Sequence, residues 1–284
     1  MKEDILHFHL PFVASVIIGN ISRLGLLKIN DSYRDSYTTN NTILYVNFLA
    51  CIIMGFLQIF NFSSYDSKLQ VCLTTGYCGT FSSFSTYIYE IFIHTVMNAH
   101  LFSNYGATVS EFFIINILEL CVSMGGLRLG IALGHTIKDA LENKDKEQHI
   151  GNNFYEEVVE KMGTFLKHTL AVISIPLVII MLVLSIVYRH RYHSYWTLSS
   201  LFAIFGAYGR YYLSKLNGKI KNNNWKYFPL GTYIANIVAS IILSILLLLL
   251  QRYNQHFTKK LVVYSLIEGF TASLSTMSTL MNEM

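Results

Sequence analysis

Two arginines lie inside apolar runs of this chain, and each follows a glycine at the same spacing. Gly19 precedes Arg23, and Gly206 precedes Arg210. A charged side chain within a membrane is costly, so an arginine there usually faces a helix-bundle interior or a water-filled cavity. The alternative for Arg23 is a side chain that reaches the membrane surface from a helix end. The chemistry that such residues offer is the handling of ions rather than the making or breaking of bonds.

A segment rich in glycine, serine and threonine occurs twice in the chain. Residues 76–87 read GYCGTFSSFSTY, residues 269–280 read GFTASLSTMSTL, and the two align without a gap as far as Glu90 and Glu283. Glycine weakens a helix interior and hydroxyl side chains compete for its backbone, so the segment predicts a broken helix. The alternative is a continuous helix with a small-residue packing face. The second copy favours the break, which must then be surrounded by protein or by a water cavity.

The composition is that of an all-α membrane protein. Of 284 residues, 52% are hydrophobic and 13% are charged, against about 25% charged in ordinary soluble domains. Apolar runs of roughly 18 to 24 residues, long enough to span a bilayer as helices, predict eight crossings. The polar leader runs into the first of them without a cleavage site, so that span is expected to be its own insertion signal.

Several classes of function are disfavoured by the same composition. The net charge is +4, with lysine and arginine placed mostly between the spans, so nucleic-acid binding is not expected. The four cysteines lie in apolar runs without metal-binding spacing and are interpreted as small buried hydrophobic residues. The ten histidines are scattered, and neither a His/Cys/Asp cluster nor a phosphate-binding loop is present. An enzyme is therefore not expected.

The chain is expected to contain two copies of one unit. Residues 1–134 form the first unit with spans 1 to 4, residues 135–194 form a soluble linker plus span 5, and residues 195–284 form the second unit with spans 6 to 8. The single span 5 would insert the second unit upside down, which gives an inverted-topology repeat with its site near the membrane midplane. The second unit is expected to lack its fourth span, and the charge bias favours an N-terminus inside.

The repeated segment and its companions resemble a known family. Residues 76–87 are similar to the third-span signature of the Fluc/CrcB fluoride channels, and the two units resemble the fused eukaryotic fluoride exporters. The glycine–arginine pairs of spans 1 and 6 and the asparagines Asn47 and Asn236 extend the resemblance over most of the chain. It implies a passive, fluoride-selective, multi-pass channel that exports cytosolic fluoride across the plasma membrane. It also implies a monomeric fused pseudo-dimer in the lipid bilayer, with no catalytic cofactor and a structural sodium ion.

The resemblance also implies roles for individual residues. The fluoride path would be lined by Phe84, Tyr87, Asn47, Asn236, Thr232, Ser83 and Ser123. Arg23 and Arg210 would attract anions into the vestibules. The backbone carbonyls of Gly79, Ser82, Ala272 and Ser275 would coordinate sodium. The second copy has Met277 and Leu280 where the first has Phe84 and Tyr87, and the first has Ile43 where the second has Thr232. At most one complete anion path is therefore expected.

Two other readings of the sequence remain open. An inverted-repeat secondary transporter would need a titratable carboxylate at the midplane, for which Glu90, Glu119 and Glu283 are the candidates. A non-conducting, degenerate paralogue is compatible with Met277, Leu280 and the expected absence of a last span.

Overall fold

The structure, a computed structural model, describes residues 4–29, 42–101, 104–148, 154–188, 190, 194–219 and 228–284. Within these ranges the regular structure is helical and includes no strand. This confirms the expected all-α fold of a membrane protein, whose apolar helices are recognisable in the structure.

The first half of the chain begins with a π-helical turn that continues into a long helix. Its elements are η1 (Ile5–His9), α2 (Leu10–Ile29), α3 (Leu44–Ile59), η2 (Phe62–Ser64), α4 (Ser67–Val71), η3 (Cys72–Cys78), α5 (Gly79–Phe81), α6 (Phe84–Phe92), η4 (Ile93–Met97), η5 (Ala99–Leu101) and α7 (Tyr105–Gln148). The segment expected to be span 3 is therefore divided among α4, η3, α5 and α6.

The second half repeats this order in part. Its elements are α9 (Tyr195–Ser214), α10 (Leu230–Arg252), α11 (Phe257–Leu266), η7 (Ile267–Thr271), α12 (Ala272–Leu274) and α13 (Ser278–Glu283). In both halves a π-helical turn comes directly before the short helix at the break. Between the halves in sequence lies α8 (Phe154–Val187), which packs on α2, α7 and α9.

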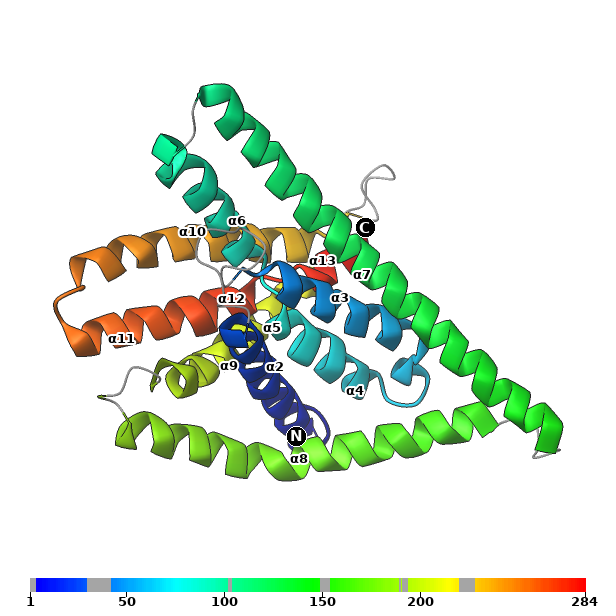
Figure 1. Ribbon diagram of the computed structural model, residues 1–284. Helices are drawn as coiled ribbons and strands as arrows, with labels where there is room; N and C mark the ends of the chain where they lie inside the picture. Colours follow the sequence, from blue (N-terminus) through cyan, green and yellow to red (C-terminus); the bar gives the residue numbers. More distant parts are fainter. Residues whose placement is uncertain are drawn as a thin grey trace.

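The two halves exchange the helices that follow their breaks. α6 of the first half packs on α10 of the second, and α13 of the second packs on α3 of the first. The short helices α5 and α12 also contact each other, so the two breaks meet at the centre of the molecule. Figure 1 shows α5, α12 and α13 in this centre, with α7 and α8 along the outside. The core that positions the site is therefore shared by both halves.

Four helices are long and apolar enough to cross a membrane by length and composition. They begin and end at Ile5–Ile29, Tyr105–Asn143, Tyr155–Val187 and Leu230–Arg252 among the described residues. The helix Leu44–Ile59 is apolar but shorter. The remaining expected crossings correspond to α9 and to the two broken segments. The number of eight crossings stays a prediction, because length and composition support four of them directly.

The segment expected to be a soluble linker is largely helical. Residues 135–194 were expected to be a soluble linker plus span 5, whereas α7 continues to Gln148 and α8 begins at Phe154. The physical reason is that this stretch is rich in glutamate and lysine, which favour helix. Lys138 also approaches Glu142 one turn later, with Nζ and Oε1 3.8 Å apart. The expected boundary at residue 134 thus falls inside a continuous helix.

Candidate functional site at the two helix breaks

The predicted break in the first repeated segment is confirmed. Ser82 has φ −87° and ψ 157°, and Ser83 has φ −145° and ψ 120°, so two extended residues separate α5 from α6. The helix of the second copy is interrupted at the matching position, where Ser275 is extended with φ −85° and ψ 163°. Each break leaves backbone N–H and C=O groups without helical partners, and these groups must find others in the protein interior.

An asparagine from the preceding helix satisfies part of each break. The Asn47 Oδ1 accepts from the backbone N–H of Ser83 at 2.9 Å, and its Nδ2 donates to the Ser83 carbonyl at 3.3 Å. Asn236 does the same for Thr276, at 2.7 and 3.1 Å. A side-chain amide offers both a donor and an acceptor, so it can pair with both backbone groups of one extended residue. These asparagines, expected in the fluoride path, therefore hold the breaks.

Each break is also closed by a serine from the other half. The Ser82 Oγ accepts from the backbone N–H groups of Met277 and Ser278, at 3.2 and 3.1 Å. The Ser275 Oγ in turn accepts from the backbone N–H of Ser85 at 3.1 Å. A hydroxyl that accepts from the first N–H groups of a helix is the usual N-terminal cap. Each half supplies such a cap itself, because Ser83 accepts from the N–H of Thr86 at 3.2 Å and Thr276 from that of Thr279 at 3.3 Å, and the serine of the opposite half adds a second one. The exchange ties α6 and α13 to the partner break.

Arg210 reaches directly into the break of the first half. Its Nη1 donates to the carbonyls of Gly79 at 2.5 Å and Ser275 at 2.9 Å. Its Nη2 donates to the Thr75 carbonyl at 2.5 Å and approaches the Thr80 hydroxyl at 3.4 Å. The guanidinium therefore joins main-chain oxygens of both halves.

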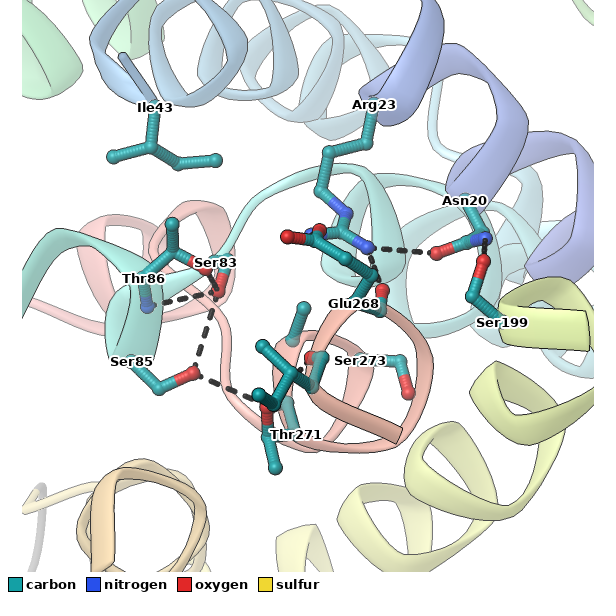
Figure 2. A network of polar contacts seen from close by, with 12 residues as sticks. Asn20, Arg23, Ile43, Ser83, Ser85, Thr86, Ser199, Glu268, Thr271 and Ser273 are labelled. Atoms are coloured by element: carbon teal, nitrogen blue, oxygen red, sulfur yellow. Dashed lines mark hydrogen bonds and ion pairs between the residues drawn. The ribbon is translucent and has the colours of Figure 1, made fainter. Parts of the chain in front are cut away.

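Arg23, the corresponding arginine of the first half, is held elsewhere. Its Nη1 lies 3.1 Å from Glu268 Oε2, and its Nη2 donates to the Glu268 carbonyl and, at 2.8 Å, to Asn20 Oδ1. Asn20 in turn donates to the hydroxyls of Ser199 and Ser200 at 3.2 and 3.0 Å. Figure 2 shows Arg23 between Asn20 and Glu268, beside the Ser83–Thr86 and Ser85–Thr271 contacts of the breaks. Glu268 is thus the ion-pair partner that the sequence did not identify.

The expected vestibule position of the two arginines differs from what the structure shows. Arg23 is 0% exposed and Arg210 is 1% exposed. Both guanidinium groups bond to protein atoms at the contact between the halves rather than facing a water-filled mouth. The physical reason is that broken backbone supplies carbonyl acceptors in the interior, and a guanidinium has several donors to satisfy there. Anion attraction by these residues remains a prediction without geometric support.

The four carbonyls expected to bind sodium are not all available to it. The Gly79 and Ser275 carbonyls accept hydrogen bonds from Arg210. The Ala272 carbonyl accepts, at 3.4 Å, from Ser275 Oγ, and the Ser82 carbonyl has no hydrogen bond of this kind among the described residues. Two of the four oxygens are therefore already used by a cation that belongs to the chain. The residues present do not fit a sodium ion in the arrangement that the structure shows.

The aromatic residues of the first repeated segment lie together beside its break. The Phe84 and Tyr87 rings meet edge to face, with centroids 5.6 Å apart and planes at 72°. The Tyr87 hydroxyl donates to Asn116 Oδ1 at 2.5 Å. Met277 and Leu280, at the matching positions of the second copy, pack in the main apolar core with Cys51 and Met54 of α3, and Phe84 contacts the same core. The two copies therefore place chemically different surfaces after their breaks.

A line of buried polar groups starts at Asn47 and follows α7. The Asn47 Nδ2 also donates to Glu119 Oε1, and Ser123 lies one turn further along the same helix. Both Glu119 and Ser123 are 0% exposed. Glu119 Oε2 and the Ser123 hydroxyl have no hydrogen-bond partner among the described residues. In the second half Thr232 approaches Asn217 instead, with Oγ1 and Nδ2 3.3 Å apart. The structure therefore joins Asn47, Ser83 and Ser123 in one region but leaves Thr232 and Asn236 in another.

The two glutamates that align in the sequence repeat lie near the start of an adjacent helix. Glu90 Oε1 accepts from the backbone N–H of Ile43, which precedes α3, at 2.8 Å. Glu283 Oε1 accepts at 2.8 Å from Asn217, whose Oδ1 accepts from the N–H of Gly231 at the start of α10. A carboxylate near a helix N-terminus is favoured by the exposed N–H groups there. Both glutamates therefore have structural partners.

Together these features define a helical membrane protein in which two similar halves close each other's broken helix. The chain belongs to the CrcB-like family, described as "CrcB-like protein, Camphor Resistance (CrcB)", whose model matches residues 11–131 and 197–284. The two matched ranges cover most of the chain. No solved structure matches it.

Two relatives match nearly the whole chain, and a third matches a little over a quarter of it. Fluoride export protein 2 of Saccharomyces cerevisiae is 29% identical, over 98% of this chain and 85% of its own length. Fluoride export protein 1 of Candida albicans is 28% identical, over 97% of this chain and 71% of its own length. The fluoride-specific ion channel FluC of Dehalococcoides mccartyi is 35% identical over 28% of this chain and 63% of its own length.

Proposed function

We propose that this protein is a fluoride channel that exports fluoride from the cell. The observation that carries the proposal is the similarity, over nearly the full length of both chains, to proteins named fluoride exporters. The similarity to a bacterial protein named as a fluoride-specific ion channel supports a channel rather than a pump. Transport is passive, through the membrane that encloses the cytosol, and no catalytic cofactor takes part.

The fluoride path follows the better-preserved side of the first break. There the Phe84 and Tyr87 rings lie edge to face beside the break that Asn47 holds. Fluoride binds its hydration water tightly, so a narrow path must offer replacement donors and positive edges. Hydroxyl groups supply the donors and the edges of aromatic rings supply the positive edges. Asn47 shapes this side of the break, because its Nδ2 already donates to the Ser83 carbonyl and to Glu119. Ser83 and Ser123 add hydroxyls along the same side, and we place the fluoride path there.

The second break lacks part of this chemistry. Met277 and Leu280 present thioether and alkyl surfaces, and Met277 is fully buried in the apolar core. Asn236 bonds to both backbone groups of Thr276, and Thr232 lies against Asn217. We therefore propose one working path rather than two, with the second break in a structural role.

An inverted arrangement of two units in one monomeric chain accounts for the exchanged contacts. α6 packs on α10 as α13 packs on α3, and each break receives its serine cap from the other half. Such reciprocal contacts are what a pseudo-two-fold relation between the halves produces. Because one chain supplies both partners of the relation, the protein needs no second copy to complete its centre.

A proton-coupled transporter is the second candidate, and Glu119 favours it. This carboxylate is fully buried, and its Oε2 has no hydrogen-bond partner among the described residues. A titratable group in the membrane interior is a recurrent part of proton-coupled transport. Coupling to protons would make fluoride movement follow a pH gradient, whereas a channel responds to the fluoride gradient and voltage alone.

One flux experiment separates these functions. The purified full-length chain is placed in liposomes loaded with potassium fluoride, and efflux is recorded with a fluoride electrode after valinomycin is added. We expect fast fluoride release without chloride release, at a rate that an imposed pH gradient leaves unchanged. Phe84→Ile should lower this rate, with Met277→Ile as the matched control in the second copy. Release no faster than from protein-free liposomes would refute the channel, and release that follows the pH gradient would favour the coupled transporter.

A further inference from the structure

Arg210 lies where two main-chain oxygens of different halves converge on one nitrogen. We infer that the Arg210 guanidinium is the structural cation of this protein, and that it replaces a bound sodium ion at the contact between the two breaks. The inference concerns how the centre of the molecule is held together. It rests on the carbonyl geometry and would stand whatever ion the protein conducts.

The geometry of Nη1 supports the replacement. This nitrogen lies 2.5 Å from the Gly79 carbonyl and 2.9 Å from the Ser275 carbonyl. Gly79 comes just before the first break, and Ser275 opens the second, so one oxygen comes from each half. A sodium ion that joined the two breaks would need these same oxygens. The guanidinium performs that joining with a side chain carried by α9.

The chemistry of the surrounding groups is that of a monovalent cation site. Arg210 is 1% exposed and has no carboxylate partner among the described residues. Three backbone carbonyls, from Gly79, Ser275 and Thr75, and the Thr80 hydroxyl receive its N–H groups. Unwound backbone carbonyls are also the groups that coordinate sodium in broken membrane helices. Arginine brings the same charge to the same kind of oxygen.

The absence of a side chain on Gly79 makes room for the guanidinium. A Cβ at this position would lie 2.5 Å from Nη2 and 2.7 Å from Cζ of Arg210. Residue 79 must therefore lack a side chain for the Arg210 guanidinium to lie against its backbone. Ala272, which matches Gly79 in the second copy, has a Cβ and no arginine against its carbonyl among the described contacts. Glycine therefore occurs in the copy whose break is contacted by Arg210, and alanine in the other copy.

A sodium ion in addition to Arg210 would meet strong repulsion. An ion bound to the Gly79 and Ser275 carbonyls would lie within a few ångströms of the guanidinium, in a buried site where water screens little. No carboxylate of the described residues forms an ion pair with Arg210, and the charge of Glu283 acts on it only from a greater distance. One cation is therefore favoured at this contact, and the covalently attached one is always present.

Glu268 explains why only one of the two arginines enters the breaks. It occupies the position in the second copy that Thr75 has in the first. Arg210 donates to the Thr75 carbonyl and also to the Gly79 carbonyl. Arg23 donates to the Glu268 carbonyl and forms an ion pair with the Glu268 carboxylate. The Glu268 side chain thus holds Arg23 aside and compensates its charge. Two like charges are kept from meeting at the centre.

The first test is the thermal unfolding of the full-length protein in detergent. It is followed in sodium chloride and in N-methyl-D-glucamine chloride of equal ionic strength. A resident sodium ion, supplied at about 100 times its dissociation constant, would raise Tm by several degrees. We expect Tm to be the same in both salts, because the cation is already present as Arg210. A saturable rise of Tm specific to sodium would overturn the inference.

The second test removes each guanidinium in turn. Arg210→Gln vacates the carbonyls of both halves, so we expect a lower Tm that sodium partly restores and N-methyl-D-glucamine does not. Arg23→Gln is the matched control, because it removes an equally buried guanidinium that touches neither Gly79 nor Ser275. Its Tm should fall by the same amount in both salts. An Arg210→Gln protein that folds but ignores sodium would overturn the inference, and if it does not fold, the sodium response of the wild type decides.

Discussion

The two halves of this protein use the same two devices at their breaks and differ in what surrounds them. Each break is held by an asparagine amide and capped by a serine from the other half. The differences are in the arginines and in the residues that follow the breaks. Arg210 bonds to broken backbone while Arg23 pairs with Glu268, and Phe84 and Tyr87 stand where the second copy has Met277 and Leu280. The shared contacts hold both breaks in the same way, whereas the differing residues suit the two halves to different roles.

The largest expected effect comes from a glycine present in both halves. A Cβ at Gly206 would overlap the Phe270 carbonyl and the Ser273 hydroxyl. Backbone cannot yield as a flexible side chain can, so Gly206→Ala should lower the free energy of unfolding by roughly 3 kcal/mol or more. Thermal unfolding in detergent measures this effect. Gly25→Ala is the control, since a Cβ there has open space around it.

Gly19 gives the same test in the first half. A Cβ at this position would lie 2.7 Å from the Tyr77 carbonyl. Tyr77 matches Phe270 in the repeat, so a comparable loss of stability in Gly19→Ala would show that both halves pack their first helix in the same way. A Gly19→Ala protein as stable as the wild type would show that the two halves pack their first helices differently.

The next effect distinguishes the two asparagines. Asn47→Ala removes the clamp on Ser83 and also the donor to Glu119. We expect fluoride efflux to fall at least about tenfold, which corresponds to about 1.4 kcal/mol in the barrier. Asn236→Ala removes only the clamp on Thr276 and should cost stability, about 1–3 kcal/mol, with little change in flux per folded protein. Equal losses of flux in both variants would refute one working path.

The aromatic positions give a smaller and more specific effect. Phe84→Ile removes the ring edge that faces the break region while it keeps an apolar side chain of similar bulk. We expect fluoride flux to fall roughly tenfold, with a change in Tm of a few degrees at most. Met277→Ile should change fluoride flux by less than about twofold, a small change in the barrier. Equal sensitivity at the two positions would contradict the unequal roles of the breaks.

The smallest effect concerns the attachment of α8 to the first half. Burial raises the pKa of the Asp66 carboxyl. The hydrogen bond and charge of Lys167 and the backbone N–H groups of Lys68 and Leu69 together outweigh this effect, so the pKa lies below its usual value. The resulting stability is fully present above the unfolded-state pKa, about 3.9, and is lost as the pH falls through the folded-state value. Asp66→Asn should remove this acid-dependent part of Tm between about pH 5 and pH 2.

A pair near the N-terminus provides the comparison for this pH effect. Asp4 and Lys68 also form an ion pair, with Oδ1 and Nζ 2.8 Å apart, but their side chains are 55% and 45% exposed. Solvent screens such a pair, so Asp4→Asn should leave the acid dependence of Tm nearly unchanged. An equal change in the acid dependence of Tm in Asp66→Asn and Asp4→Asn would show that burial does not strengthen the Asp66–Lys167 ion pair.

Much of the fold followed from residue types and spacing. Two glycine- and hydroxyl-rich copies predicted two broken helices, because such residues weaken a helix wherever they occur. The partners of the arginines could not be predicted in this way. Arg210 bonds to the carbonyls of Thr75, Gly79 and Ser275, and a carbonyl is present at every residue, so no side-chain pattern marks it. Their position depends on how the two breaks meet.

The long helices were misjudged for a different reason. Charged residues after Leu133 indicated where the apolar stretch of α7 ends, and a soluble linker was predicted from residue 135 onward. Charge limits how far a helix extends into lipid, but lysine and glutamate are good helix formers in water. Membrane boundaries and helix boundaries are thus separate properties. The Glu268–Arg23 pair was missed because Glu268 lies in an apolar run at a position where the first copy has Thr75.

The exchanged serine caps constrain the order in which the protein can mature. Ser82 and Ser85 are bonded to groups 190 to 196 residues later in the chain. At about 5–20 residues per second, a ribosome needs roughly 10 to 40 s to synthesise that interval. During this time the first break has its own asparagine and the Ser83 cap, but not the cap from the other half. The topology therefore delays completion of the centre until Ser275 and α13 have been synthesised, and truncated translation products would present the unfinished break to the cell's quality-control machinery.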